Sequence, residues 1–440
     1  MLNNTKFSPH SLRFLFYHCL WKLLLFCLKP QKALLPPKVR SYLEEREVEQ
    51  IVWRQSPLPQ QRRIWFHAAS GEIEYIKPLL RLWKQEHPDD LLFVTYFSTS
   101  ARPMLQALAE VDGWAPLPYD LPDPCQRFLD CLQPSILVIS RTDLWPTILN
   151  KMNAPKILVA STWAEGSKKT QGLGRWMTRW CLEYINKVGV VSEDDAEWIH
   201  RFRPHTSVAV TGDPRFDQVE FRLQQKRALP SPLTVWSQNK SVLVAGSTWT
   251  EDEQVLLPAW KKFRSLCSES ELPRLLIVPH ETHFSHLSDL IKLCESDNID
   301  YCLWSQAKNQ SSLINSEILI FDEKGWLAEL YQLGRLAFIG GSFKKQVHSV
   351  MEALGCGLPV LVGPNYKNNR EALAFAKLRH GDQYFLISVN ESESLAQNFT
   401  KYWSLPEEES KDLRLRIRQE FLSRCEATRS TFKEIQKCLS

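Results

Sequence analysis

The sequence predicts an α/β protein with two domains of similar size, each built on a parallel sheet. Its 440 residues exceed one ordinary domain, and two domains of roughly 150–200 residues are the usual arrangement at this length. Short apolar runs rich in β-branched residues alternate with segments of helical period along most of the chain. Such alternation is typical of parallel sheets covered on both faces. It stops once, in a polar stretch with two prolines at 222–240, which we interpret as the domain boundary.

The composition is that of a globular protein and does not indicate nucleic acid or a metal as a partner. Hydrophobic residues make up 44% of the chain and charged residues 24%, which excludes a disordered protein. The net charge is +4 with acids and bases interleaved, so no nucleic-acid partner is indicated. The 11 cysteines are scattered without a CxxC pair, and neither a zinc site nor a disulfide framework is expected.

The N-terminal segment, residues 1–40, differs from the rest. Residues 11–29 (SLRFLFYHCLWKLLLFCLK) are mostly apolar, but Arg13, His18 and Lys22 interrupt them. A spanning helix needs about 20 apolar residues with few charges, so we expect a helix that lies in the membrane interface. The alternative is an amphipathic helix packed on its own domain.

Two sets of strands follow, one in each predicted domain. Parallel sheets of this Rossmann-like type bind ligands beyond the carboxyl ends of their strands, so we expect a site in a cleft between the domains. Helical segments such as 72–86 and 101–110 lie between the strands. The domain at 41–228 has expected strands at 63–69, 91–98, 135–140, 156–161, 187–192 and 207–212, and the domain at 229–440 has them at 241–247, 274–280, 317–322, 336–342 and 358–364.

The first candidate site residue is Glu72, in the segment HAASGEIE at 67–74. The amides of Ser70 and Gly71 are expected to point toward the start of the following helix, where partial positive charge collects. A carboxylate at that place is expected to stay ionised and to accept a proton from a substrate hydroxyl. The alternative is that Glu72 only complements the helix dipole.

Two further strand ends of the first domain carry charged residues. SRTDLWP at 140–146 places Arg141 and Asp143 after a strand, either in a functional role or with Asp143 as a helix N-cap. TGDPRFDQV at 211–219 places Arg215 between two aspartates. Arg215 either neutralises a phosphate or carboxylate or forms a local salt bridge.

In the second domain, Gly340 and Gly341 end a strand, and a helix is expected near His348 with Glu352 one turn in. This pattern suits a nucleotide, with a phosphate on the glycine amides and the ribose diol on the carboxylate. A plain glycine turn before an amphipathic helix is the alternative. In VPHETHF at 278–284 the histidine spacing argues against a metal, and His280 is better explained by a nucleotide contact.

Taken together, segments from about residue 12 to residue 430 resemble a known enzyme family. The order and spacing of these segments match those of the family. The segments are HAASGEIEYIKPLL, PLPYDLPDPCQRFLD, DLWP, VTGDPRFD, GSTWTEDE, DEKGWLAELYQLGRLAFIGGS and HSVMEALGCGLPVLVGPNYKN. The chain resembles the 3-deoxy-D-manno-octulosonic acid (Kdo) transferases, which are membrane-associated glycosyltransferases of the GT-B fold. The resemblance implies an inverting transfer of Kdo from CMP-Kdo to a lipid A precursor in lipopolysaccharide core biosynthesis, on the cytoplasmic face of the inner membrane.

The resemblance also implies residue roles. Glu72 would be the general base, and Arg215, in place of the more usual Lys, would stabilise the transition state. Neither a metal nor a cofactor is implied. Arg141 stands where the family usually has a Glu, which leaves open a different donor or acceptor, or a non-catalytic CMP-binding relative. The implied CMP contacts are Pro279, His280, Lys324, Gly325, Trp326, Ser349, Val350, Met351 and Glu352.

Overall fold

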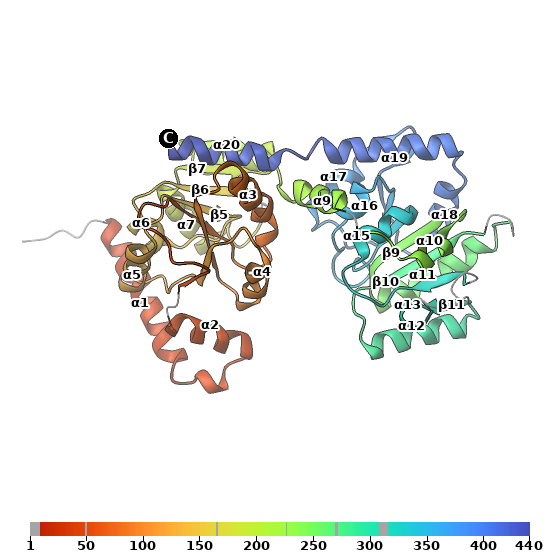
Figure 1. Ribbon diagram of the computed structural model, residues 1–440, viewed down its shortest axis with the longest axis horizontal. Helices are drawn as coiled ribbons and strands as arrows, with labels where there is room; N and C mark the ends of the chain where they lie inside the picture. Colours follow the sequence, from red (N-terminus) through yellow and green to blue (C-terminus); the bar gives the residue numbers. More distant parts are fainter. Residues whose placement is uncertain (1–8, 49–50, 164–165, 226, 269–271, 308–315) are drawn as a thin grey trace, which may run out of the picture. The chain divides into compact units, whose positions relative to one another are not determined.

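A computed structural model of the chain describes residues 9–48, 51–163, 166–225, 227–268, 272–307 and 316–440 (Figure 1). The chain divides into two units, of which the first comprises Met1–Gln218 and Arg424–Ser440 and the second Val219–Ser423. This division differs from the predicted ranges in two places. The boundary falls at 218/219 instead of 228/229, because Leu223 and Trp236 are buried in the second unit. The last residues return to the first unit, because Phe432 and Ile435 pack in its core.

The first unit has an eight-stranded sheet in the order β1-β4-β3-β2-β5-β6-β7-β8. All neighbours are parallel except the pair β1 and β4. The six predicted strands are therefore confirmed, and β1 and β4 were missed. The strands are β1 (Val52–Trp53), β2 (Arg63–His67), β3 (Leu91–Tyr96), β4 (Gly113–Pro116), β5 (Ile136–Ser140), β6 (Lys156–Ser161), β7 (Lys187–Val190) and β8 (Val208–Val210).

Helices cover both faces of this sheet. Along β2, Trp65 packs into one hydrophobic core and its neighbours Ile64 and Phe66 into the core on the opposite face. This two-sided burial explains why the strand is apolar without alternation. The helices are α1 (Pro9–Leu28), α2 (Pro37–Val48), α3 (Ile73–Glu86), α4 (Arg102–Ala107), α5 (Pro122–Leu132), α6 (Pro146–Lys151), α7 (Gly172–Cys181), α8 (Glu193–Phe202) and α20 (Ala427–Leu439), with 3₁₀ turns at Lys32–Leu34, Thr99–Ala101 and Leu182–Tyr184.

The N-terminal helix α1 is docked on the first unit along one face. The Tyr17 hydroxyl donates to the buried Asp120 at 2.9 Å, and His18 Nε2 lies 2.9 Å from Thr147 Oγ1. Phe14 packs edge-on against Trp180 with 4.8 Å between ring centroids. The other face stays apolar and exposed, and it includes Leu12, Leu15, Phe16, Leu20, Leu23, Leu24 and Phe26. Within the described residues, no helix has a stretch both long and apolar enough to cross a bilayer.

The second unit has a seven-stranded parallel sheet in the order β11-β12-β10-β9-β13-β14-β17. The five predicted strands are confirmed, and the edge strands β11 and β17 were missed. The strands are β9 (Val242–Thr248), β10 (Arg274–Pro279), β11 (Tyr301–Leu303), β12 (Ile318–Ile320), β13 (Gly334–Ile339), β14 (Val360–Val362) and β17 (Leu386–Ser388), and a separate antiparallel ribbon is formed by β15 (Arg379–His380) and β16 (Gln383–Tyr384).

Helix α9 (Arg215–Gln224) carries the chain across the boundary at 218/219. Trp260 of α11, Leu354 of α16 and Phe399 of α18 are fully buried in the second unit. Its helices are α10 (Ser231–Ser237), α11 (Thr250–Arg264), α12 (Phe284–Ser296), α13 (Trp304–Ala307), α15 (Leu327–Leu330), α16 (Met351–Gly355), α17 (Arg370–Ala376), α18 (Ser392–Trp403) and α19 (Glu407–Leu422), with a 3₁₀ turn at Tyr331–Leu333.

Candidate active site

Glu72 lies between β2 and α3, at the carboxyl edge of the sheet of the first unit. It occupies the N-cap position of α3, which begins at Ile73. The Ala69 amide donates to Glu72 Oε2 at 3.4 Å, and the Ser140 hydroxyl donates to the Glu72 carbonyl at 3.1 Å. Two neighbouring strands therefore fix this residue, because Ala69 follows β2 and Ser140 ends β5.

A pair formed by the buried His67 and the half-buried Asp143 lies beside Glu72. His67 Nε2 is 2.9 Å from Asp143 Oδ2, and its Nδ1 is 2.8 Å from Thr95 Oγ1. Burial opposes ionisation of Asp143, but the hydrogen bond and charge of His67, together with Trp145 and Lys169, outweigh it and lower the pKa of this carboxyl. The N-cap interpretation of Asp143 is wrong, since Trp145 holds that position at the start of α6.

The electrostatics at Glu72 differ from the expectation that the helix start keeps this carboxylate ionised. Burial, and after it the Asp143 carboxylate, raise the pKa of Glu72 above its ordinary value. The Ala69 amide, Lys169 and His67 oppose this shift and are outweighed. A carboxylate with a raised pKa holds a proton more firmly at neutral pH, which suits a general base.

Lys169 also belongs to this group, and sequence reasoning missed it. Its Nζ donates to the carbonyl and the hydroxyl of Thr142, both at 2.7 Å. Burial lowers the pKa of Lys169, while the charges of Asp143 and Glu72 act in the opposite direction. Lys169 lies in the polar segment after β6, where no local pattern distinguishes it from Lys168.

Arg141 and Arg215 converge on one aromatic side chain, Tyr75 of α3. Arg141 Nη1 donates to the Tyr75 hydroxyl at 2.9 Å, and its Cζ lies 5.0 Å from the ring centroid. Arg215 Cζ lies 4.4 Å from the same centroid, and Arg215 also pairs with Asp213 at 2.6 Å. Arg215 thus forms the local salt bridge considered above and still reaches the group around Glu72 through Tyr75.

Ser70 and Gly71 form the turn that precedes Glu72. The Ser70 hydroxyl is 3.1 Å from the Ser100 hydroxyl. The carbonyls of Ser70 and Gly71 accept the amides of Ile73 and Glu74, both at 3.2 Å. A Cβ at Gly71 would meet no atom within 4 Å, so the turn is open on that side.

In the second unit, the predicted donor-site residues follow neighbouring strands at the carboxyl edge of the sheet. Pro279 ends β10 and His280 follows it, Lys324, Gly325 and Trp326 come after β12, and Gly340 and Gly341 come directly after β13. Ser349 and Val350 precede α16, whose first residues are Met351 and Glu352. The fold therefore brings together the residues that the sequence predicted for one ligand.

The sequence suggested that the amides of Gly340 and Gly341 bind a phosphate. In the structure, both amides instead donate to groups of the protein itself. The Gly340 amide donates to the Gly246 carbonyl at 2.9 Å, and the Gly341 amide donates to Asp252 Oδ2 at 2.7 Å. Gly340 is required by packing, because a Cβ there would lie 2.3 Å from the Ser247 carbonyl oxygen. The glycine-turn alternative is thus confirmed for these two amides.

Three rings cluster at the same edge of the second sheet. Trp249 Nε1 donates to His348 Nε2 at 2.8 Å, with an interplanar angle of 14°. His280 stacks on both, with centroids 4.2 Å from His348 and 4.7 Å from Trp249. Burial, followed by the charge of His280, lowers the pKa of His348 to about 4, so this ring is neutral at physiological pH. Trp249 was not predicted, although the quoted segment GSTWTEDE contains it.

Two predicted residues of the second unit have internal partners. Glu352 accepts Arg222 Nη1 at 2.8 Å. The Arg227 guanidinium lies 4.1 Å from the Trp326 ring centroid and pairs with Glu329 at 3.0 Å. Among the described residues, no group of three His, Cys, Asp or Glu side chains is arranged to hold a metal ion.

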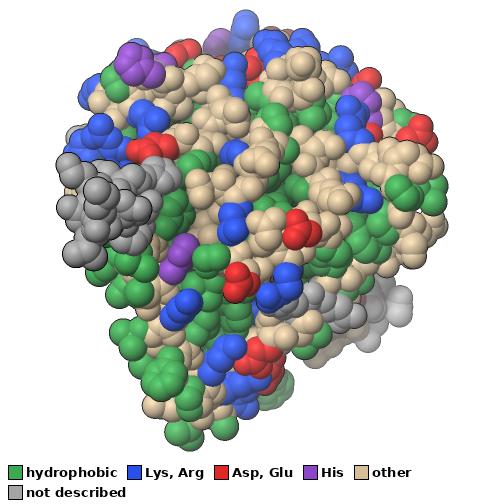
Figure 2. All heavy atoms as spheres, turned by 90° about the vertical axis from the view of Figure 1, so that its left-hand side faces the viewer, with side chains coloured by type: hydrophobic (Ala, Val, Ile, Leu, Met, Phe, Trp, Pro, Cys, Tyr) green, Lys and Arg blue, Asp and Glu red, His purple; other side chains and the backbone are tan. Residues whose placement is uncertain are grey.

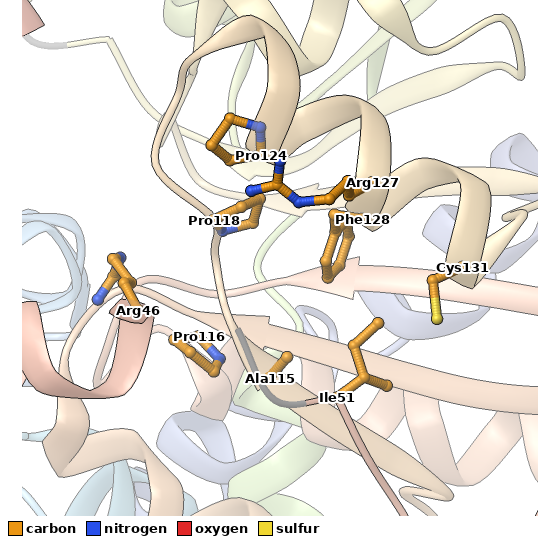
Figure 3. Close-up of a pocket in the computed structure, with 9 residues that line it drawn as sticks. All are labelled: Arg46, Ile51, Ala115, Pro116, Pro118, Pro124, Arg127, Phe128 and Cys131. Carbon is orange, nitrogen blue, oxygen red and sulfur yellow. The ribbon is translucent and has the colours of Figure 1, made fainter. Parts of the chain in front are cut away.

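A separate cavity of about 380 Å³ lies where β4 meets α5 in the first unit (Figure 3). Its lining is mainly apolar and rigid, with side chains converging from β4, α5 and the proline-rich segment between them. None of the predicted site residues lines it. The lining residues are Arg46, Ile51, Ala115, Pro116, Pro118, Pro124, Arg127, Phe128 and Cys131.

Known proteins resemble this chain at the level of sequence and of fold. Residues 43–218 match the sequence model of the family described as 3-deoxy-D-manno-octulosonic-acid transferase (kdotransferase). The enzyme named 3-deoxy-D-manno-octulosonic acid transferase from Haemophilus influenzae is 25% identical over 78% of this chain and 80% of its own length. Its namesake from Chlamydia muridarum is 28% identical over 69% of this chain and 70% of its own.

Solved structures resemble the chain in fold alone. A glycosyltransferase from Rickettsia africae has a TM-score of 0.58 at 12% identity, covering 87% of this chain and 99% of that one. A UDP-GlcNAc 2-epimerase from Neisseria meningitidis has a TM-score of 0.59 at 13% identity, covering 86% and 100%. The α/β architecture with two parallel sheets is therefore that of GT-B-like proteins. The family match at 43–218 and the relatives that align over most of the chain therefore make this protein similar in sequence to the 3-deoxy-D-manno-octulosonic acid transferases.

Proposed function

We propose that this protein is an inverting glycosyltransferase that moves Kdo from CMP-Kdo to a lipid A precursor in lipopolysaccharide biosynthesis. Kdo transfer is supported by the sequence similarity to enzymes that are named for this activity. The observation that carries the proposal is Glu72, a half-buried carboxylate with a raised pKa at the carboxyl edge of the first sheet.

In this mechanism Glu72 accepts the proton of the acceptor hydroxyl, whose oxygen then attacks the anomeric carbon as CMP leaves. Two parts of the site support this role. The Asp143 carboxylate, which is hydrogen-bonded to His67, places a negative charge beside Glu72 and so favours proton uptake by Glu72. Arg215, held by Asp213 and Tyr75, is suited to stabilise negative charge that develops during transfer.

The CMP portion of the donor is assigned to the second unit. Its candidate contacts are the residues at the carboxyl edge of that sheet, from Pro279 and His280 to the start of α16. The amides of Gly340 and Gly341 are engaged internally, so the phosphate is assigned to other groups of this edge, of which Lys324 supplies the charge. The chemistry requires neither a metal nor a cofactor, because CMP is itself the leaving group.

We place the protein at the cytoplasmic face of the inner membrane with its lipid acceptor, and the exposed apolar face of α1 supports contact with a membrane. Leu23 and Phe26 are 60% and 76% exposed, although the opposite face of α1 is docked on the protein. Figure 2 shows apolar side chains at the lower end of the face in view, with Lys and Arg as well as Asp and Glu among them. A docked helix with one exposed apolar face suits a position in the membrane interface, with basic residues at the headgroups.

The test is release of CMP from CMP-Kdo in the presence of a tetra-acylated lipid A precursor. The native protein is expected to release CMP only when the acceptor is present. Glu72→Gln, which keeps the size of the side chain, is expected to lower the rate about 10²- to 10⁴-fold. A native protein that binds CMP but releases none from CMP-Kdo would refute the proposed reaction. Equal rates for both proteins would refute the role of Glu72.

A further inference from the structure

Arg141 has a backbone conformation that residues other than glycine rarely adopt. Its φ of 62° lies in the left-handed region, which is uncommon for residues other than glycine. The Arg141 amide donates to the Val159 carbonyl at 2.9 Å, so the end of β5 remains attached to β6 in this conformation. The next residue of β6, Ala160, also has a positive φ, of 51°. Such outliers persist where the surrounding structure enforces them, often at ligand sites.

The Arg141 side chain is held by a neutral partner. Its polar contact within the described ranges is the bond to the Tyr75 hydroxyl at 2.9 Å, and it forms no ion pair with a carboxylate there. Arg215, by contrast, is paired with Asp213. A guanidinium has five N–H donors. Arg141 therefore keeps most of its donors, and its full charge, for an anion that this unit does not itself supply.

The chemistry of the transferred sugar places such an anion nearby. Kdo is a 2-keto sugar acid, so its carboxylate is attached to the anomeric carbon, where the new bond forms. The acceptor oxygen that Glu72 deprotonates bonds to that carbon, and the carboxylate must therefore come close to Glu72. Glu72 and Tyr75 are three residues apart at the start of α3, a spacing at which helical side chains are neighbours. Arg141 is bonded to Tyr75, and the preceding residue, Ser140, donates its hydroxyl to the Glu72 carbonyl, so the chain holds Arg141 next to this part of α3.

We propose that Arg141 binds the carboxylate of the transferred sugar acid and thereby selects and orients the donor sugar. This inference rests on the proposed function. Planar guanidinium groups bind carboxylates through two parallel hydrogen bonds, and Tyr75 holds the fork in place. A phosphate of the acceptor presents similar oxyanion chemistry, and the experiment separates the two sources.

The experiment measures donor and acceptor KM and kcat for the native protein, Arg141→Gln, Arg141→Lys and Tyr75→Phe. Each protein is assayed with CMP-Kdo and with acceptors that carry or lack phosphate groups. Loss of a charged hydrogen bond predicts a rise of about 10- to 100-fold in donor KM/kcat for Arg141→Gln. Arg141→Lys is expected to recover part of this loss, and Tyr75→Phe to show a smaller rise. Arg201→Gln removes an exposed charge from the same unit and serves as the matched control.

The outcomes are distinguishable. Without turnover by the native protein, the proposed function fails. With native turnover but unchanged donor kinetics in Arg141→Gln, the carboxylate assignment fails alone. If Arg141→Gln instead removes only the preference for phosphorylated acceptors, the ligand is the acceptor phosphate and the proposal is overturned. Should the Arg141 variants not fold, Tyr75→Phe decides, because an unchanged donor KM there contradicts the proposal.

Discussion

Helix α1 can be tested for two separable roles, docking on the protein and contact with the membrane. The perturbation that addresses docking is Tyr17→Phe, which removes one hydroxyl and keeps the ring. Asp120, its partner, is 2% exposed and also accepts the amides of Thr147 and Ile148, both at 2.9 Å. Burial raises the pKa of Asp120, and these donors counteract the shift. Loss of a hydrogen bond to a buried charged group costs about 1.5–3 kcal/mol.

We therefore expect Tyr17→Phe to lower the free energy of unfolding by about that amount in urea titrations monitored by tryptophan fluorescence. Binding to vesicles that contain anionic lipid should change little, because the exposed face of α1 is untouched. Phe26→Ser is the complementary variant, since the Phe26 side chain is 76% exposed. It should leave stability within about 0.5 kcal/mol and weaken vesicle binding about 5- to 30-fold, as expected for loss of most of one phenyl contact.

Two results would refute this reasoning. If Tyr17→Phe has no effect on unfolding, α1 is not anchored through Asp120 in solution. If Phe26→Ser binds vesicles as tightly as the native protein, the exposed apolar face of α1 is not the surface that meets the membrane.

Three further predictions concern pH and packing. The raised pKa of Glu72 predicts that kcat falls on acidification at a pH above the ordinary carboxyl value of 4.5, because the base must be ionised; a pH–rate profile without such a limb contradicts this. The pKa of Asp217 is raised by burial from 3.8 to about 6, so the folded state binds the proton more tightly between these values. The unfolding free energy should fall as pH rises through this window, by about 2–3 kcal/mol, and Asp217→Asn should flatten the slope. Gly340→Ala should destabilise the second unit by about 1–3 kcal/mol or more in thermal unfolding, because its Cβ meets backbone, whereas Gly71→Ala, with open space around it, should not.

The fold was largely predictable because the strands are buried on both faces. Runs such as 135–140 and 241–247 are apolar without interruption, and β5 and β9 begin and end within a residue of them. The missed strands β1 and β11 have two and three residues and lie at sheet edges, where partial burial leaves little pattern in the sequence. β8 is equally short and lies at the opposite edge of its sheet, but its apolar run was still recognised.

The site was predictable in position but not in its contacts. Residues at strand ends meet at one sheet edge, so Glu72, Arg141 and Asp143 could be grouped from their sequence positions alone. Their partners come from distant parts of the chain. The amide of Gly341 is bound by Asp252, 89 residues earlier, and the pKa of Glu72 depends on Asp143, which the helix-dipole argument ignored. Three-dimensional neighbours of this kind leave no local signal.

The return of α20 to the first unit has a consequence for biosynthesis. Phe432 and Ile435, at the very end of the chain, complete a hydrophobic core whose other members lie between Ile64 and Val159. During translation the core of the first unit therefore stays incomplete, with this apolar surface exposed, until the whole of the second unit has left the ribosome. Domains usually fold as units in the order of synthesis. Here the second unit is free to fold first, and a nascent chain that stops at residue 423 would leave the first unit without α20.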